Sequence, residues 1–187
     1  IYGAETKLRS ARYYIPNNLS YLDLLDLFMH GDADFLKSVR IFDGVSNEWI
    51  AGAVNRELKV DSTAFISLVN NKSILDSLGV NANSLEGYLL PGKYLIFERS
   101  SPEEVLNHLY SGMNNIFSDS INKHINNLGR NKHQILTMAS IIEGETKKVE
   151  EMPTIAGVYF NRLRIGMRLQ ADPTLQYLQK GGWKRLS

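Results

Sequence analysis

The chain of 187 residues contains no cysteine, only five prolines and only two tryptophans. Without cysteine, neither a disulfide framework nor a thiolate metal site is possible, although proteins of the cell envelope can also lack cysteine. No run of about 18 apolar residues occurs, so the sequence predicts no transmembrane helix. No signal-peptide pattern is present either. Because the chain begins at Ile1 rather than at methionine, we expect a fragment, with any membrane anchor lying upstream.

The formal net charge is only +1, so the chain lacks the broad basic footprint that nucleic-acid binding requires. Residues 161–187 are nevertheless basic, with a single acid, Asp172, and six cations: Arg162, Arg164, Arg168, Lys180, Lys184 and Arg185. This basic stretch could bind an anionic ligand or could simply form a solvated surface, and charge alone does not distinguish the two interpretations. The four histidines lack metal-ligand spacing, so we predict neither a metal nor a cofactor: His30, His108, His124 and His133.

Length and composition fit one globular domain, or one domain with a small satellite. Capping residues and apolar periodicity predict helices after Ser20, after Ser46, over 63–70, from Ser101 to a helical end at Gly129, over 134–145 and over 153–163. Strand-like runs occupy 39–42 and 88–97, the second of them interrupted by Pro91-Gly92. Many helices with a few separated strands predict an α+β fold.

Residues 135–146 form an apolar helix that ends on two carboxylates, Glu143 and Glu145. At 100° per residue, the predicted buried face comprises Ile135, Met138, Ala139 and Ile142. The two acids then fall on opposite edges of this face, where partial burial would favour the protonated form that a general acid needs. Because opposite edges argue against a retaining pair in one cleft, we expect one carboxylate to act. The helical wheel does not show which of the two acids would act. The alternative interpretation is that both are ordinary surface charges without a catalytic role.

A second informative stretch covers residues 158–174, VYFNRLRIGMRLQADPT. It ends a helix at Leu163 and then becomes polar and turn-rich, with Gly166 allowing a tight bend. Asp172-Pro173 favours an extended or turn conformation. Loops crowded with hydrogen-bonding side chains often line binding sites. The alternative is a turn that satisfies itself, with Asp172 in an Asx-type hydrogen bond.

Both stretches resemble segments of the YceG-like endolytic murein transglycosylases, the MltG family. Residues 139–146, ASIIEGET, resemble an ASIVEKET-type segment, and residues 158–174 resemble VFxNRLRxGMxLQxDPT. Upstream, residues 39–65 resemble the family's strand–Glu-Gly–helix segment, and residues 85–94, LEGYLLPGKY, resemble LEGYLFPDTY. The chain departs from this pattern at Asp43-Gly44 for Glu-Gly, at Gly92-Lys93 for Asp-Thr and at Gly144, where lysine is common. A later NTY…GLPPGPI-like segment does not occur in the chain.

The resemblance implies that residues 1–35 are the end of a small LysM-like lobe and that residues 36–187 are a catalytic domain truncated at its C-terminal end. It places the catalytic acid at Glu143. The positions matching the motifs that line a glycan cleft are Glu145, Asn161, Arg162, Arg168, Gln170, Asp172 and Thr174.

The implied reaction is lytic cleavage of the MurNAc–GlcNAc β-1,4 bond of peptidoglycan, with formation of 1,6-anhydroMurNAc ends. Its expected partners are peptidoglycan strands and cell-wall synthases. The resemblance also implies anchoring in the bacterial inner membrane, with the catalytic part facing the cell wall. Two alternatives stay open: a hydrolytic muramidase that uses water, and a scaffold that binds peptidoglycan without cleaving it.

Overall fold

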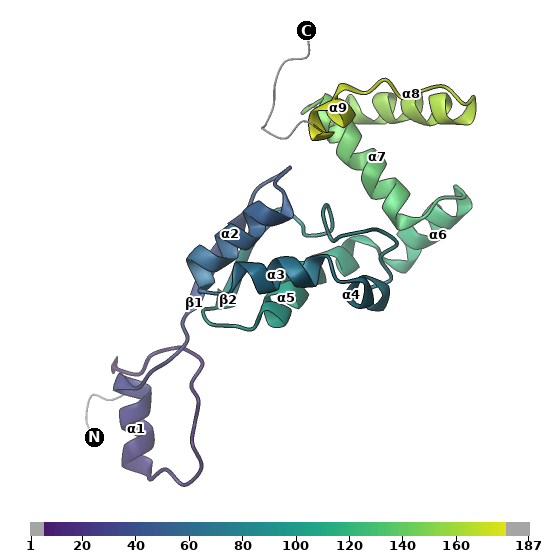
Figure 1. Cartoon of the computed structure of the whole chain (residues 1–187). Coiled ribbons are helices and arrows are strands. Elements are labelled where there is room, and N and C mark those ends of the chain that lie inside the picture. Colours follow the sequence, from purple (N-terminus) through teal and green to yellow (C-terminus); the bar gives the residue numbers. More distant parts are fainter. Residues whose placement is uncertain (1–5, 179–187) are drawn as a thin grey trace. The chain divides into compact units, whose positions relative to one another are not determined.

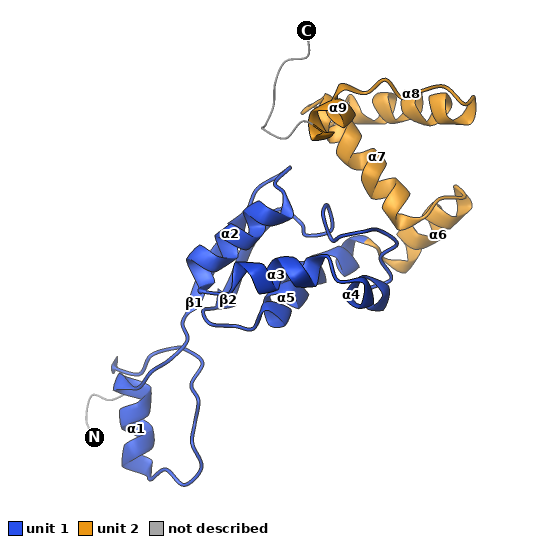
Figure 2. Cartoon of the chain, in the orientation of Figure 1, with its two compact units in different colours: residues 1–116 blue, residues 117–187 orange. Residues whose placement is uncertain are grey.

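The computed structural model describes residues 6–178. The chain divides into two compact units at Ile116–Phe117, so the described residues fall into 6–116 and 117–178 (Figure 2). Helices dominate both units, and the first unit also holds a two-stranded antiparallel sheet (Figure 1). This confirms the predicted α+β class. Within residues 6–178, no helix is both long and apolar enough to cross a membrane.

The first unit is built on strands β1, Leu36–Ile41, and β2, Gly92–Phe97, which pair from Leu36 opposite Phe97 to Ile41 opposite Gly92. Helix α2, Asn47–Leu58, packs against β1. Helix α3, Ser62–Val69, packs against α2 and against α5, Pro102–Ile116, while α4, Lys72–Ser77, follows α3. The side chains buried most completely come from β1, the four helices α2 to α5 and one connection, namely Val39, Val54, Leu58, Phe65, Val69, Leu75, Leu85, Val105, Leu109 and Met113.

Local capping explains where the predicted helices begin. The Ser46 side chain accepts a hydrogen bond from the Trp49 backbone N–H at 3.3 Å, as expected for an N-cap. Ser101 and Glu104 form a reciprocal capping box, with both hydrogen bonds at 3.1 Å, and Pro102 occupies the first helical position. These capping predictions are confirmed. A cap involves only four or five consecutive residues, so the local sequence is sufficient to predict it.

Helix α1, Tyr21–His30, begins after Ser20, as predicted, at a Ser20–Asp23 capping box, and Gly31 is its C-cap. Ion pairs join the segment that follows it to the rest of the first unit. The Arg99 guanidinium donates to Asp32 at 2.8 and 2.9 Å and to Asp34 at 2.6 Å. Arg12 contacts Asp34 at 3.1 Å and Glu104 at 3.3 Å. The LysM-like identity of residues 1–35, and a domain boundary after them, stay predictions.

The second unit consists of α6, Asp119–Asn127, α7, Lys132–Glu145, α8, Met152–Arg164, and α9, Asp172–Leu178. Helix α7 packs against α6, α8 and α9. Its core is a cluster of five buried residues, Met138, Ile141, Ile142, Tyr159 and Ala171. The candidate site residues all belong to this unit.

Some local predictions are wrong. Residues 88–90 do not belong to a strand: a turn covers residues 86–88, where Gly87 has φ 80° and the Tyr88 N–H donates to the Leu85 carbonyl. The helical region expected from Ser101 to Gly129 is interrupted at residues 117–118, between α5 and α6. Helix α4 was not predicted, although the Asn71 side chain caps it.

Candidate active site

Helix α7 carries both candidate acids near its C-terminal end. It begins at an Asn131–Gln134 capping box and ends at Glu145, with the Thr146 N–H donating to the Ile142 carbonyl. Its buried residues are Met138, Ile141 and Ile142. The predicted buried face is therefore wrong in part: Ala139 is exposed, whereas Ile141 is buried. The true face is turned toward Ile141 because α8 and α9 pack on that side.

Because the buried face of α7 is centred nearer to Ile141 than predicted, the two acids no longer occupy equivalent edges of that face. Glu145 lies four residues after Ile141 and seven after Met138, so it projects from the same side of the helix as the buried residues, although Glu145 itself is exposed rather than partly buried. Glu143 projects from the opposite side of the helix and is exposed, which corrects the expected partial burial. Among residues 6–178, the Glu143 side chain has no hydrogen-bond or ion-pair partner. It is therefore a carboxylate available to a ligand.

Glu145 is held by a buried phenol. The Tyr159 hydroxyl of α8 donates to the Glu145 Oε1 at 2.5 Å, and Tyr159 is only 5% exposed. Burial, and then the hydrogen bond to the carboxylate, raise the pKa of Tyr159 to about 12. The Arg162 guanidinium lies 5.9 Å from the centroid of the same ring. The hydrogen bond from Tyr159 thus gives Glu145 a partner, whereas Glu143 has none among residues 6–178.

The Asp172–Thr174 segment lies at the end of α7. Gly144, between the two acids, has no room for a Cβ atom because the Pro173 ring occupies that space. Asp172-Pro173 begins α9 instead of the expected extended or turn segment, since proline is tolerated in the first turn of a helix. The chain thus brings the second motif directly against the first (Figure 1).

The other residues of the second motif fall into two groups. Arg162 donates from Nη1 to the Leu169 carbonyl, and Thr174 donates to the Ala171 carbonyl at 2.7 Å, so both stabilise the connection between α8 and α9. The alternative interpretation, an Asx-type hydrogen bond of Asp172, is not found, because the Asp172 side chain accepts no hydrogen bond from residues 6–178. Three further polar side chains are exposed: Asn161, Arg168 and Gln170.

Gln170 has an unusual backbone. Its φ is 51°, in the left-handed region that residues other than glycine, asparagine and aspartate rarely adopt. Strain of this kind is often found at functional sites, where packing holds it in place. Here Leu169 packs against the core cluster and Ala171 is buried within it, so the strained residue is fixed from both sides.

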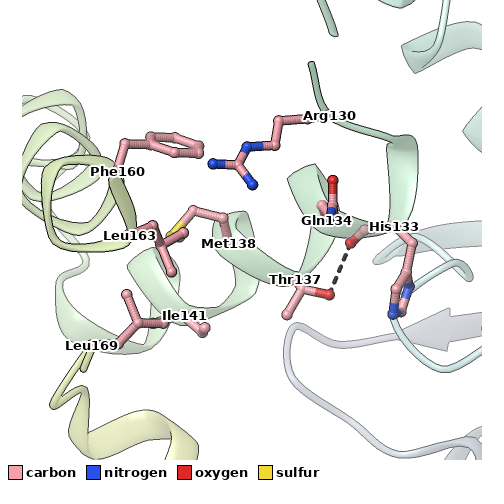
Figure 3. A pocket seen from close by; sticks show the side chains of 9 residues that line it. All are labelled: Arg130, His133, Gln134, Thr137, Met138, Ile141, Phe160, Leu163 and Leu169. Atoms are coloured by element: carbon pink, nitrogen blue, oxygen red, sulfur yellow. Dashed lines mark hydrogen bonds between the residues drawn. The ribbon is translucent and has the colours of Figure 1, made fainter. Parts of the chain in front are cut away.

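A hollow of about 360 Å³ runs along the Met138–Ile141 side of α7. Figure 3 shows the side chains of α7, α8 and the connecting loop around it, with the Arg130 guanidinium directed toward Phe160. The lining residues are Arg130, His133, Gln134, Thr137, Met138, Ile141, Phe160, Leu163 and Leu169. The sequence did not reveal this hollow because it is formed by packing. The basic residues Lys180, Lys184 and Arg185 lie outside the described residues.

Comparison with known proteins identifies the family and supports the fold. The model of the YceG-like family matches residues 1–187. The chain belongs to the YceG-like family. A crystal structure of a yceG-like protein from Listeria monocytogenes aligns with 100% of this chain and 66% of its own, at a TM-score of 0.69 and 22% identity, which supports the fold.

Two curated relatives of this YceG-like chain are named endolytic murein transglycosylase. The relative from Streptococcus pneumoniae strain D39 is 29% identical over 203 residues, which cover 95% of this chain and 37% of the relative. The relative from Bacillus subtilis strain 168 is 24% identical over 193 residues, covering 94% of this chain and 53% of the relative. The YceG-like chain thus spans between about a third and a half of the length of these relatives.

Proposed function

We propose that this YceG-like chain carries the acid/base centre of an endolytic murein transglycosylase and that Glu143 is the catalytic residue. The observation that carries the proposal is the difference between the two acids at the end of α7. Glu145 is held by Tyr159, whereas Glu143 is exposed and has no partner among residues 6–178. A general acid must be able to reach the atom that it protonates, and Glu143 differs from Glu145 in that neither of its carboxylate oxygens accepts a hydrogen bond from residues 6–178.

In the proposed reaction, protonated Glu143 donates its proton to the glycosidic oxygen between MurNAc and GlcNAc. The bond from MurNAc C1 to that oxygen breaks through an oxocarbenium-like transition state. The MurNAc 6-hydroxyl oxygen then bonds to C1, and its proton returns to the Glu143 carboxylate. The products are a 1,6-anhydroMurNAc end and a GlcNAc end with a free 4-hydroxyl. Because the nucleophile belongs to the substrate, one enzyme carboxylate is sufficient.

Glu143 is exposed in the free protein, so the glycan itself must supply the desolvation that favours a protonated acid. A sugar ring lying over the carboxylate would exclude water from it. Glu145, Asn161, Gln170, Asp172 and Thr174 are proposed to bind glycan hydroxyl and acetamido groups. Arg168 is the better candidate for a lactyl or stem-peptide carboxylate, because Arg162 already donates to the Leu169 carbonyl.

The substrate class requires action on the cell wall, outside the cytoplasmic membrane. We propose peptidoglycan strands as the main partner, and cell-wall synthases as further partners that would supply nascent strands. Membrane anchoring of the full-length protein is part of the same proposal.

The proposal is tested by mass spectrometry of purified peptidoglycan digested by the full-length protein and by its Glu143→Gln variant. We expect the wild type to produce internal anhydromuramyl cuts and the variant to lose at least about 100-fold of the rate, as for removal of a general acid. Glu150→Gln is the matched control, since Glu150 is an exposed glutamate of the same unit, and we expect it to keep wild-type activity.

Each other outcome contradicts part of the proposal. Reducing MurNAc ends, one water heavier than anhydro ends, would replace the transglycosylase with a muramidase. Unchanged cleavage by Glu143→Gln would transfer the acid role to another residue, and Glu145→Gln would be examined next. Glycan binding by the wild type without any cleavage would favour the non-catalytic scaffold.

A further inference from the structure

The contact between Tyr159 and Glu145 has features that packing alone does not explain. The Tyr159 ring belongs to the buried cluster of the second unit. Its hydroxyl nevertheless donates a hydrogen bond to Glu145, which is exposed. Phenylalanine would fill the same space in the cluster without reaching Glu145.

The location of Glu145 at the end of α7 makes a hydrogen-bond donor favourable there. Glu145 is the last residue of α7, where unpaired backbone carbonyls give the helix end a partial negative charge. A carboxylate at this end is repelled and would turn toward solvent. The Tyr159 hydrogen bond opposes this repulsion and fixes one carboxylate oxygen at 2.5 Å from the phenol.

The second carboxylate oxygen remains available. Only Oε1 of Glu145 accepts from Tyr159, and Oε2 accepts no hydrogen bond from residues 6–178. A carboxylate oxygen can only accept hydrogen bonds, so its natural ligand is an N–H or O–H donor. Since Pro173 lies against Gly144, the residue just before Glu145, this acceptor stands beside the second motif of the proposed site.

From this geometry we infer that Tyr159 is a positioning residue, which holds Glu145 so that its Oε2 accepts a hydrogen bond from an acetamido N–H or a hydroxyl group of the bound glycan. This inference rests on the proposed function, because it concerns the same site and the same substrate class. Tyr159 acts only through Glu145 and does not contact the substrate. Its hydroxyl therefore contributes to glycan binding and not to the bond-breaking step.

The experiment compares Tyr159→Phe with wild type in the full-length protein, using peptidoglycan glycan oligomers of defined length. We expect KM to rise about 5–10-fold with kcat changed less than about twofold, because an interaction formed equally in ground and transition states affects binding only. In a Glu143→Gln background, which separates binding from cleavage, Kd for the same oligomers should rise by the same factor. Glu145→Gln combined with Tyr159→Phe should weaken binding no further than Glu145→Gln alone.

Tyr110→Phe is the matched control. Tyr110 is also a buried tyrosine, but its hydroxyl donates to a backbone carbonyl, that of Leu78, at 3.2 Å. We expect this variant to lose stability to a similar extent without a change in KM or Kd. Equal Kd values for wild type and Tyr159→Phe in the Glu143→Gln background would overturn the inference while leaving the proposed function intact. Oligomers that neither bind to nor are cleaved by the wild type would overturn both.

Discussion

Gly144 and Pro173 lie so close together that a methyl group on Gly144 would stand 2.7 Å from the Pro173 Cβ and 2.8 Å from its Cγ. The contact joins the end of α7, between the two candidate acids, to the start of α9. It thereby couples the two sequence motifs that define the site.

Gly144→Ala tests this contact. Alanine in the interior of a helix is normally more stable than glycine by about 0.5–1 kcal/mol. Here we expect the opposite, a net loss of about 1–2 kcal/mol, because overlap with a proline ring costs about 1–3 kcal/mol. Urea unfolding measures the change. Gly157→Ala is the control, since a Cβ atom at this position in α8 meets nothing within 4 Å, and it should stabilise the protein.

Gln170→Gly tests the strained loop. A left-handed backbone costs a residue with a side chain about 1–2 kcal/mol, while glycine loses about 0.5–1 kcal/mol through its greater freedom in the unfolded chain. We therefore expect unchanged or slightly higher stability together with weaker glycan binding. Met167→Gly, at an exposed position of the same loop without positive φ, should destabilise the protein. A large loss of stability in Gln170→Gly would show that the strain is absent.

Acid should weaken the first unit. The Arg99 guanidinium lowers the pKa of Asp32, and the Ser101 backbone N–H and then Arg12 lower the pKa of Glu104. Carboxyl groups in the unfolded chain have pKa values of about 4, so the unfolded state binds more protons below that pH. Stability should be constant from about pH 7 to 5 and fall as pH drops through about 4 and below.

Asp32→Asn should make this acid-induced loss shallower in unfolding experiments across the same pH range. The exposed Asp43→Asn serves as control, because Asp43 lies in the turn between β1 and α2 and has no ion-pair partner among residues 6–178. An equally steep loss in Asp32→Asn and wild type would contradict the role assigned to the Arg99–Asp32 pair.

Alkaline pH should report on Tyr159. Its pKa is raised to about 12 by burial and by the hydrogen bond to Glu145, whereas a phenol in the unfolded chain ionises at about 10. Stability should therefore decline as pH rises from about 10 to 12, because only the unfolded state loses the proton in that interval. Tyr159→Phe should remove part of this decline, and Tyr14→Phe, whose side chain is 86% exposed, should remove none. Equal declines in all three proteins would contradict the buried, hydrogen-bonded phenol.

The sequence by itself determined the features that depend on neighbouring residues. The starts of α1, α2 and α5 follow from the capping residues Ser20, Ser46 and Ser101, since a cap is made within one helical turn. The alternation of helices with two short strands likewise gave the α+β class. The family was also recognised from the sequence, because residues 139–146 and 158–174 resemble two segments of the YceG-like family and occur in the same order.

Only the tertiary structure decided how these pieces act together. The helical wheel placed Glu143 and Glu145 on equivalent edges of α7, and the packing of α8 and α9 made them different. Tyr159 reaches Glu145, and Pro173 reaches Gly144, across 14 and 29 residues of sequence respectively. Such contacts depend on how helices pack, and packing is set by the shapes of many side chains at once rather than by any local pattern.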